Sequence, residues 1–69
     1  MAELTERDRR ILEFIGQGRS DDWISRQFHI SEQEIATIVG RIERKTGLHT
    51  RADLEQLGRS IKDAEKRIN

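Results

Sequence analysis

Five basic side chains that could bind phosphate lie between residues 26 and 51 of this 69-residue chain, at Arg26, Arg41, Arg44, Lys45 and Arg51. Guanidinium and ammonium groups donate hydrogen bonds to phosphate oxygens, and an arginine can also donate two bonds to the edge of a guanine. One such residue alone is commonly a solvated surface charge. Five in one region favour a partner that is rich in phosphate, such as nucleic acid.

The sequence lacks the residue patterns of catalytic and metal sites. It contains no Cys and no Tyr, and its two histidines, His29 and His49, do not have the spacing of metal ligands. The adjacent carboxylates Asp21 and Asp22 are better explained as favourable charges at the positive end of a helix dipole than as an acid–base pair. We therefore expect no enzymatic activity, no metal site and no cofactor.

The formal net charge is zero, because 13 Lys and Arg residues balance 13 Asp and Glu residues. The two signs are unevenly distributed along the chain. Residues 1–34 carry 5 basic and 8 acidic side chains, whereas residues 35–69 carry 8 basic and 5 acidic ones. A basic surface for nucleic acid would therefore lie in the second half of the chain.

Four helices are predicted to position these residues. Gly16 or Gly18 is expected to end the first helix and Gly47 the third, because glycine readily adopts the left-handed conformation of a helix C-terminus. The predicted helices span about residues 6–16, 21–28, 32–46 and 51–67, with no strand-like alternation between them. We expect one all-α domain over residues 1–69, since so short a chain cannot form two cores. Each start combines a Ser or Thr N-cap with an acidic residue in the following turn, namely Thr5 with Asp8, Ser20 with Asp21 and Asp22, Ser31 with Glu34, and Thr50 with Asp53.

Apolar residues recur at helical spacing on each predicted helix, and Trp23 is expected in the core or at its edge. The last helix has a different pattern, with successive apolar residues 3 or 4 positions apart as in a heptad repeat. This seam could dock on the domain itself or pack against a second chain. The small core expected of a 69-residue domain favours a homodimer. The predicted dimerisation residues are Leu54, Leu57, Ile61, Ala64 and Ile68.

The second and third predicted helices, joined by a short turn, have the arrangement of a DNA-binding helix-turn-helix. The run from Leu4 to Leu54 also resembles the LuxR/GerE-type helix-turn-helix domain, at Leu4, Thr5, Arg7, Ile11, Leu12, Gly18, Ser20, Ile24, Phe28, Ile30, Ser31, Ile35, Ile42, Lys45, Gly47, Leu48 and Arg51. Members of that family are mostly bacterial transcription regulators. Their third helix reads the DNA groove, and their fourth helix contacts the second subunit of a dimer.

This resemblance implies a homodimeric transcription regulator that binds double-stranded DNA with a recognition helix over residues 32–46. It also implies that Lys45 and Arg51 contact phosphate. The DNA-binding residues expected are Gln33, Thr37, Arg41 and Arg44 at base edges, and Lys45, Arg51 and Arg26 at phosphates.

The chain departs from the family pattern near the start of the recognition helix. The family usually has Thr-Val-Lys where this chain has Glu34, Ile35 and Ala36, and Gly40 follows one turn later. The usual lysine is therefore missing, and Glu34 would face a phosphate backbone unfavourably. Two functions stay open: a DNA-binding regulator, or a helix-turn-helix-derived module that binds a partner regulator protein and inhibits it.

No stretch of the sequence approaches the ~18 apolar residues needed to span a membrane, and the N-terminus lacks the features of a signal peptide. We therefore expect a soluble, cytoplasmic protein without a membrane partner. It could act alone or belong to a longer regulator.

Overall fold

The computed structural model describes residues 3–67, and their side chains as far as residue 66. Four α-helices account for most of this range: α1 (Glu6–Gly16), α2 (Asp21–Phe28), α3 (Glu32–Thr46) and α4 (Arg51–Arg67). No β-strand occurs within the described residues, and the predicted all-α, four-helix fold is confirmed. Among the same residues, no helix has both the length and the apolar character needed to cross a membrane.

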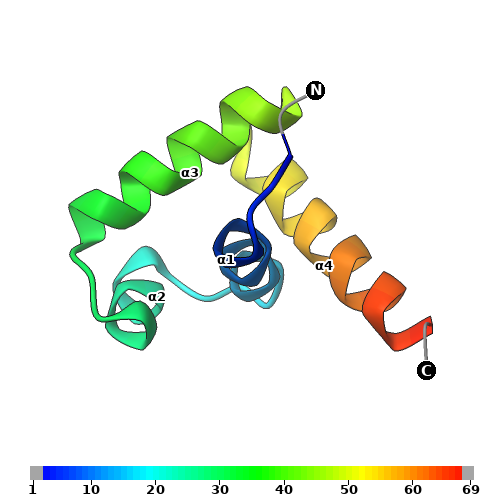
Figure 1. Ribbon diagram of the computed structural model, residues 1–69, viewed down its shortest axis with the longest axis horizontal. Helices are drawn as coiled ribbons and strands as arrows, with labels where there is room; N and C mark the ends of the chain where they lie inside the picture. The colour runs from blue at the N-terminus through cyan, green and yellow to red at the C-terminus, as the bar shows by residue number, and fades with distance from the viewer. Residues whose placement is uncertain (1–2, 68–69) are drawn as a thin grey trace.

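The other three helices lie around α1, which is seen almost end-on at the centre of Figure 1. Helix α3 crosses above α1, and α2 lies below the N-terminal end of α3. Helix α4 begins near the C-terminal end of α3, passes beside α1 and continues toward the C-terminus. The last turns of α4 therefore lie far from α2 and from the start of α3 (Figure 1).

Each helix begins at a Ser or Thr side chain that accepts a hydrogen bond from the first turn, which confirms the four predicted N-caps. In α1 the cap is reciprocal: the Thr5 hydroxyl accepts from the Asp8 N–H at 3.1 Å, and the Asp8 carboxylate accepts from the Thr5 N–H at 3.1 Å. These bonds satisfy donors that a helix start leaves without partners. In the other three caps the hydroxyl oxygens of Ser20, Ser31 and Thr50 accept from the backbone N–H groups of Trp23, Glu34 and Asp53, respectively.

Left-handed residues follow the first three helices. Gly18 has a φ of 82°, His29 a φ of 57° and Gly47 a φ of 75°. Gly47 ends α3 as predicted, whereas His29 ends α2 in a conformation that glycine adopts more easily. Because the chain reverses so sharply at His29, only residues 29–31 separate α2 from α3. This is the short turn of a helix-turn-helix.

The core lies between α1, α3 and the first half of α4, with Ile24 added from α2. Trp23 lies at its edge, with its ring centroid 5.0 Å from that of Phe14 in an edge-to-face arrangement. This confirms the interpretation of Trp23 as a core or core-edge residue. The buried apolar residues are Ile11, Leu12, Ile15, Ile24, Ile35, Ile38, Ile42 and Leu54.

Helices α1 and α4 approach so closely that their backbones touch. A Cβ atom placed on Gly58 would overlap the carbonyl oxygen of Leu12, and one placed on Gly16 would lie 2.8 Å from the Arg59 nitrogen. Both glycines therefore leave space for the facing helix. Gly16, one of the two predicted ends of the first helix, is the last residue of α1, and it also packs against α4.

Candidate nucleic-acid interface

One face of α3 points away from the core and carries polar and small side chains. Gln33, Thr37 and Arg44 are exposed on this face, and Arg41 is half-buried beside them. Residues three and four apart share a helix face, so these four side chains form one stripe. The Thr37 hydroxyl donates to the Gln33 carbonyl oxygen at 3.1 Å. The four residues expected to probe base edges therefore lie together.

The stripe is small at its middle and acidic at its N-terminal end. Ala36 is exposed next to Thr37, and a Cβ on Gly40 would meet nothing closer than an Arg44 guanidinium nitrogen at 3.9 Å. Glu32 and Glu34 are exposed in the first turn, where negative charge is favourable to the helix dipole. Positive charge on this face is therefore confined to its C-terminal half.

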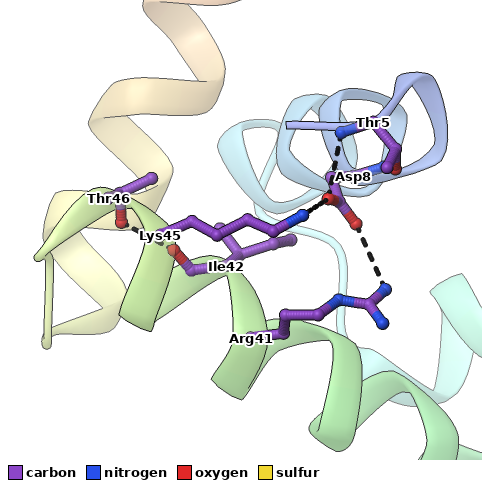
Figure 2. Close-up of polar contacts among 6 residues, drawn as sticks. All are labelled: Thr5, Asp8, Arg41, Ile42, Lys45 and Thr46. Carbon is purple, nitrogen blue, oxygen red and sulfur yellow. Dashed lines mark hydrogen bonds and ion pairs between the residues drawn. The ribbon is translucent and has the colours of Figure 1, made fainter. Parts of the chain in front are cut away.

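Asp8 of α1 is fully buried and holds two basic residues of α3 (Figure 2). Its Oδ2 atom lies 3.1 Å from the Lys45 ammonium nitrogen and also accepts the Thr5 N–H. Its Oδ1 atom lies 3.6 Å from a guanidinium nitrogen of Arg41, which is too long for a strong hydrogen bond. The Lys45 side chain is only 18% exposed, whereas that of Arg41 is 42% exposed. Lys45 therefore joins α3 to α1, and Arg41 keeps access to solvent.

The charge of Asp8 is maintained by these partners. Burial by itself would raise the pKa of the Asp8 carboxyl, but the hydrogen bond from the Thr5 N–H and the ammonium of Lys45 lower the pKa below its ordinary value of 3.8. The carboxylate is therefore ionised near neutral pH and remains a partner for both cations.

Two further basic residues of the predicted interface are paired with the first turn of α2. Arg26 lies 3.0 Å from the Asp22 carboxylate, and Arg51 lies 3.0 Å from that of Asp21. Arg51 also donates to the backbone oxygen of Arg19 at 3.3 Å. Among the described residues, Arg44 is the one basic residue of the predicted interface that forms no ion pair.

The predicted dimerisation residues of α4 divide into two groups. Leu54 is 1% exposed in the domain's own core, whereas Leu57 and Ile61 are half-buried and Ala64 is exposed. Ile68 lies outside the described residues. Leu57, Ile61 and Ala64 line an open groove of about 340 Å³ between the ends of α1 and α4. Leu4, Arg9 and Glu65 complete its lining. The surface available to a second chain therefore begins at Leu57.

The model of the GerE family, described as bacterial regulatory proteins of the luxR family, matches residues 2–57. The chain belongs to the luxR family. The matched range contains α1, the α2–α3 helix-turn-helix and the first part of α4, and it confirms the resemblance found in the sequence. This luxR-family chain is therefore a helix-turn-helix domain of the DNA-binding regulatory type. No match was found among the curated proteins or among the solved structures.

The structure also shows partners of the predicted interface residues that the sequence did not identify. In this luxR-family chain Asp8, Asp21 and Asp22 are direct partners of four basic residues that were expected to contact DNA. The sequence identified them only as helix-capping charges. One signal was present for Asp8, since it precedes the apolar Ile11 and Leu12 by three and four residues and so lies on the buried face of its helix.

Proposed function

We propose that this chain is a transcription regulator that acts in the cytoplasm as a homodimer and inserts α3 into the major groove of double-stranded DNA. The observation that carries the proposal is the exposed stripe of α3, which follows a three-residue turn within the luxR-family match. Lys45 would contact phosphate only by exchanging its bond to Asp8. The other proposed contacts are Gln33, Thr37, Arg41 and Arg44 with base edges, and Arg26 and Arg51 with phosphates.

Arg44→Ala is expected to weaken duplex binding about tenfold, because one arginine contact with a base edge is worth about 1–3 kcal/mol. The fold should be unaffected, since Arg44 is exposed and forms no ion pair with the described residues. Fluorescence anisotropy with a labelled duplex would measure the affinity. Arg59→Ala is the matched control, because it removes an equal charge from an exposed position on α4. An equal loss in both variants, or none in Arg44→Ala, would place Arg44 outside the interface.

We propose that the second copy packs against Leu57, Ile61 and Ala64, whose apolar groove continues the heptad spacing of α4. Ala64→Glu is expected to convert the dimer to a monomer, because it would place a charge in this apolar contact. Sedimentation velocity would measure the change. Ala52→Glu is the matched control, since Ala52 is also exposed on α4 but lies on its other face. A wild-type chain that sediments as a monomer would contradict the homodimer.

A second candidate is the module that binds a partner regulator protein and inhibits it. Exposed Glu32 and Glu34, together with Ala36 at the position of the family lysine, favour this function because they weaken attraction to phosphate. Titration of the wild-type chain with duplex DNA over a range of salt concentrations separates the two candidates. A regulator that binds DNA would bind at low salt and dissociate steeply as salt rises, whereas the inhibitory module would not bind DNA.

A further inference from the structure

The ion pairs of this chain have a common pattern. Each of the four between described residues joins a basic side chain of the proposed DNA interface to an aspartate of α1 or α2. Aspartates of the acidic first half of the chain thus pair with Arg41, Lys45 and Arg51 of the second half and with Arg26 of α2. Each proposed phosphate contact therefore already has an anionic partner.

Carboxylate and phosphate oxygens compete for the same donors on arginine and lysine. A basic side chain that is already paired with a carboxylate must lose that pair before it binds DNA, and it then neutralises fewer phosphate charges in the net balance. We propose that Asp8, Asp21 and Asp22 restrain DNA binding by holding Lys45, Arg41, Arg51 and Arg26. The restraint lowers the affinity for duplex DNA of any sequence. The base contacts of α3 then contribute a larger share of the binding free energy. The restraint rests on the proposed DNA-binding function.

The restraint is weaker at α2 than at α1. The Asp21 and Arg51 side chains are each 40% exposed, and Asp22 and Arg26 are more exposed still. Such exposed pairs contribute little to stability, so a phosphate can displace their carboxylates. Asp8, in contrast, is fully buried and also caps α1. Arg26 and Arg51 are therefore the residues that exchange most readily, and Asp21 and Asp22 can be changed without disturbing the core.

Asp21→Asn and Asp22→Asn test the proposal, because each frees one arginine while keeping the size of the side chain. Each variant is expected to bind a random-sequence duplex more tightly at low salt. The slope of log affinity against log salt should become steeper by about 0.9 for one added phosphate contact. This gain should shrink about threefold between about 50 and 200 mM salt. The preference for a selected sequence over random sequence should fall.

Asp63→Asn is the matched control, since it makes the same change in net charge at an exposed position in the last two turns of α4. Its salt slope should equal that of the wild type. Circular dichroism at the assay temperature would verify that all variants are folded. The proposed restraint would be overturned if the salt slopes of both α2 variants equalled that of the wild type. It would also be overturned if the slope of Asp63→Asn became steeper by as much as theirs. Either result would leave DNA binding itself intact. If neither the wild type nor any variant binds duplex at low salt, the proposed function fails and the restraint fails with it.

Discussion

Gly58→Ala is expected to lower the free energy of unfolding by about 3 kcal/mol, because overpacking of a well-packed contact costs about 1–3 kcal/mol and more where nothing can move aside. The added Cβ would overlap the Leu12 carbonyl oxygen and lie 2.8 Å from its carbonyl carbon and 3.1 Å from the Gly16 nitrogen. These are backbone atoms of α1, which cannot rotate away as a side chain could. The two helices would have to separate, which would open the core around Leu12 and Leu54.

The matched control is Gly40→Ala, in which the same methyl group is added to the middle of α3. Its nearest neighbour would be a flexible Arg44 guanidinium nitrogen at 3.9 Å. Alanine is favoured over glycine inside a helix by about 1 kcal/mol, so this variant should be more stable than the wild type. Urea unfolding followed by far-UV circular dichroism would measure both changes. A Gly58→Ala chain as stable as the wild type would show that the backbones of α1 and α4 are not in contact.

Asp8→Asn is expected to lower the free energy of unfolding by about 3 kcal/mol, because removing one partner of a buried ion pair leaves a charge without compensation. Lys45 is 18% exposed and would remain beside a neutral amide, and the salt bridge to Arg41 would also be lost. The matched control is Asp53→Asn. Asp53 occupies the same position after the N-cap of α4, but it is exposed and forms no ion pair with described residues. Asp53→Asn should lower the free energy of unfolding by less than about 1 kcal/mol.

The loss of unfolding free energy caused by Asp8→Asn should depend on pH. Because its partners lower the pKa of Asp8 below 3.8, the charged carboxylate stabilises the fold fully at pH values above the pKa of the unfolded chain. This contribution is lost as the pH falls below about 4 and through the lower pKa of the folded state. The wild type and Asp8→Asn should therefore become more similar in stability in acid. A difference that is constant from about pH 2 to about pH 7 would show that the charge of Asp8 does not stabilise the fold.

Glu13 has the opposite pH dependence and must be separated from that of Asp8. Burial and the neighbouring Glu65 carboxyl raise the pKa of Glu13 above 4.5. A raised pKa in the folded state contributes stability at acid pH, and that stability is lost as the pH rises through the raised value. The pH dependence of the wild type contains both effects. The contribution of Glu13 cancels in the difference in unfolding free energy between the wild type and Asp8→Asn, because both chains retain Glu13.

The fold could be predicted from the sequence because its signals are local. An N-cap such as Thr5 and a helix end such as Gly47 depend on residues within one turn, and apolar spacing identifies the buried face of each helix. The Asp8–Lys45 bond joins residues 37 positions apart and depends on how α1 and α3 cross. Local capping explained Asp8 well enough that its second role was not identified.

The same reasoning explains what the sequence left open in α3 and α4. Gly40 and Gly58 both lie inside a helix, and only the crossing of α1 and α4 determines that Gly58 is packed and Gly40 is open. Heptad spacing likewise serves docking within the domain and packing against a second chain equally well. The structure assigns Leu54 to the core, and it leaves Leu57, Ile61 and Ala64 at the groove.

Selection of bound sequences from a pool of randomised duplexes, carried out at low salt with the wild-type chain, tests the proposed function most directly. We expect enrichment of two half-sites related by two-fold symmetry, with centres about one helical turn or 34–36 Å apart. Affinity for the enriched duplex should fall steeply as salt is added. Recovery of no duplex at low salt would contradict DNA binding and would favour the module that binds a partner regulator.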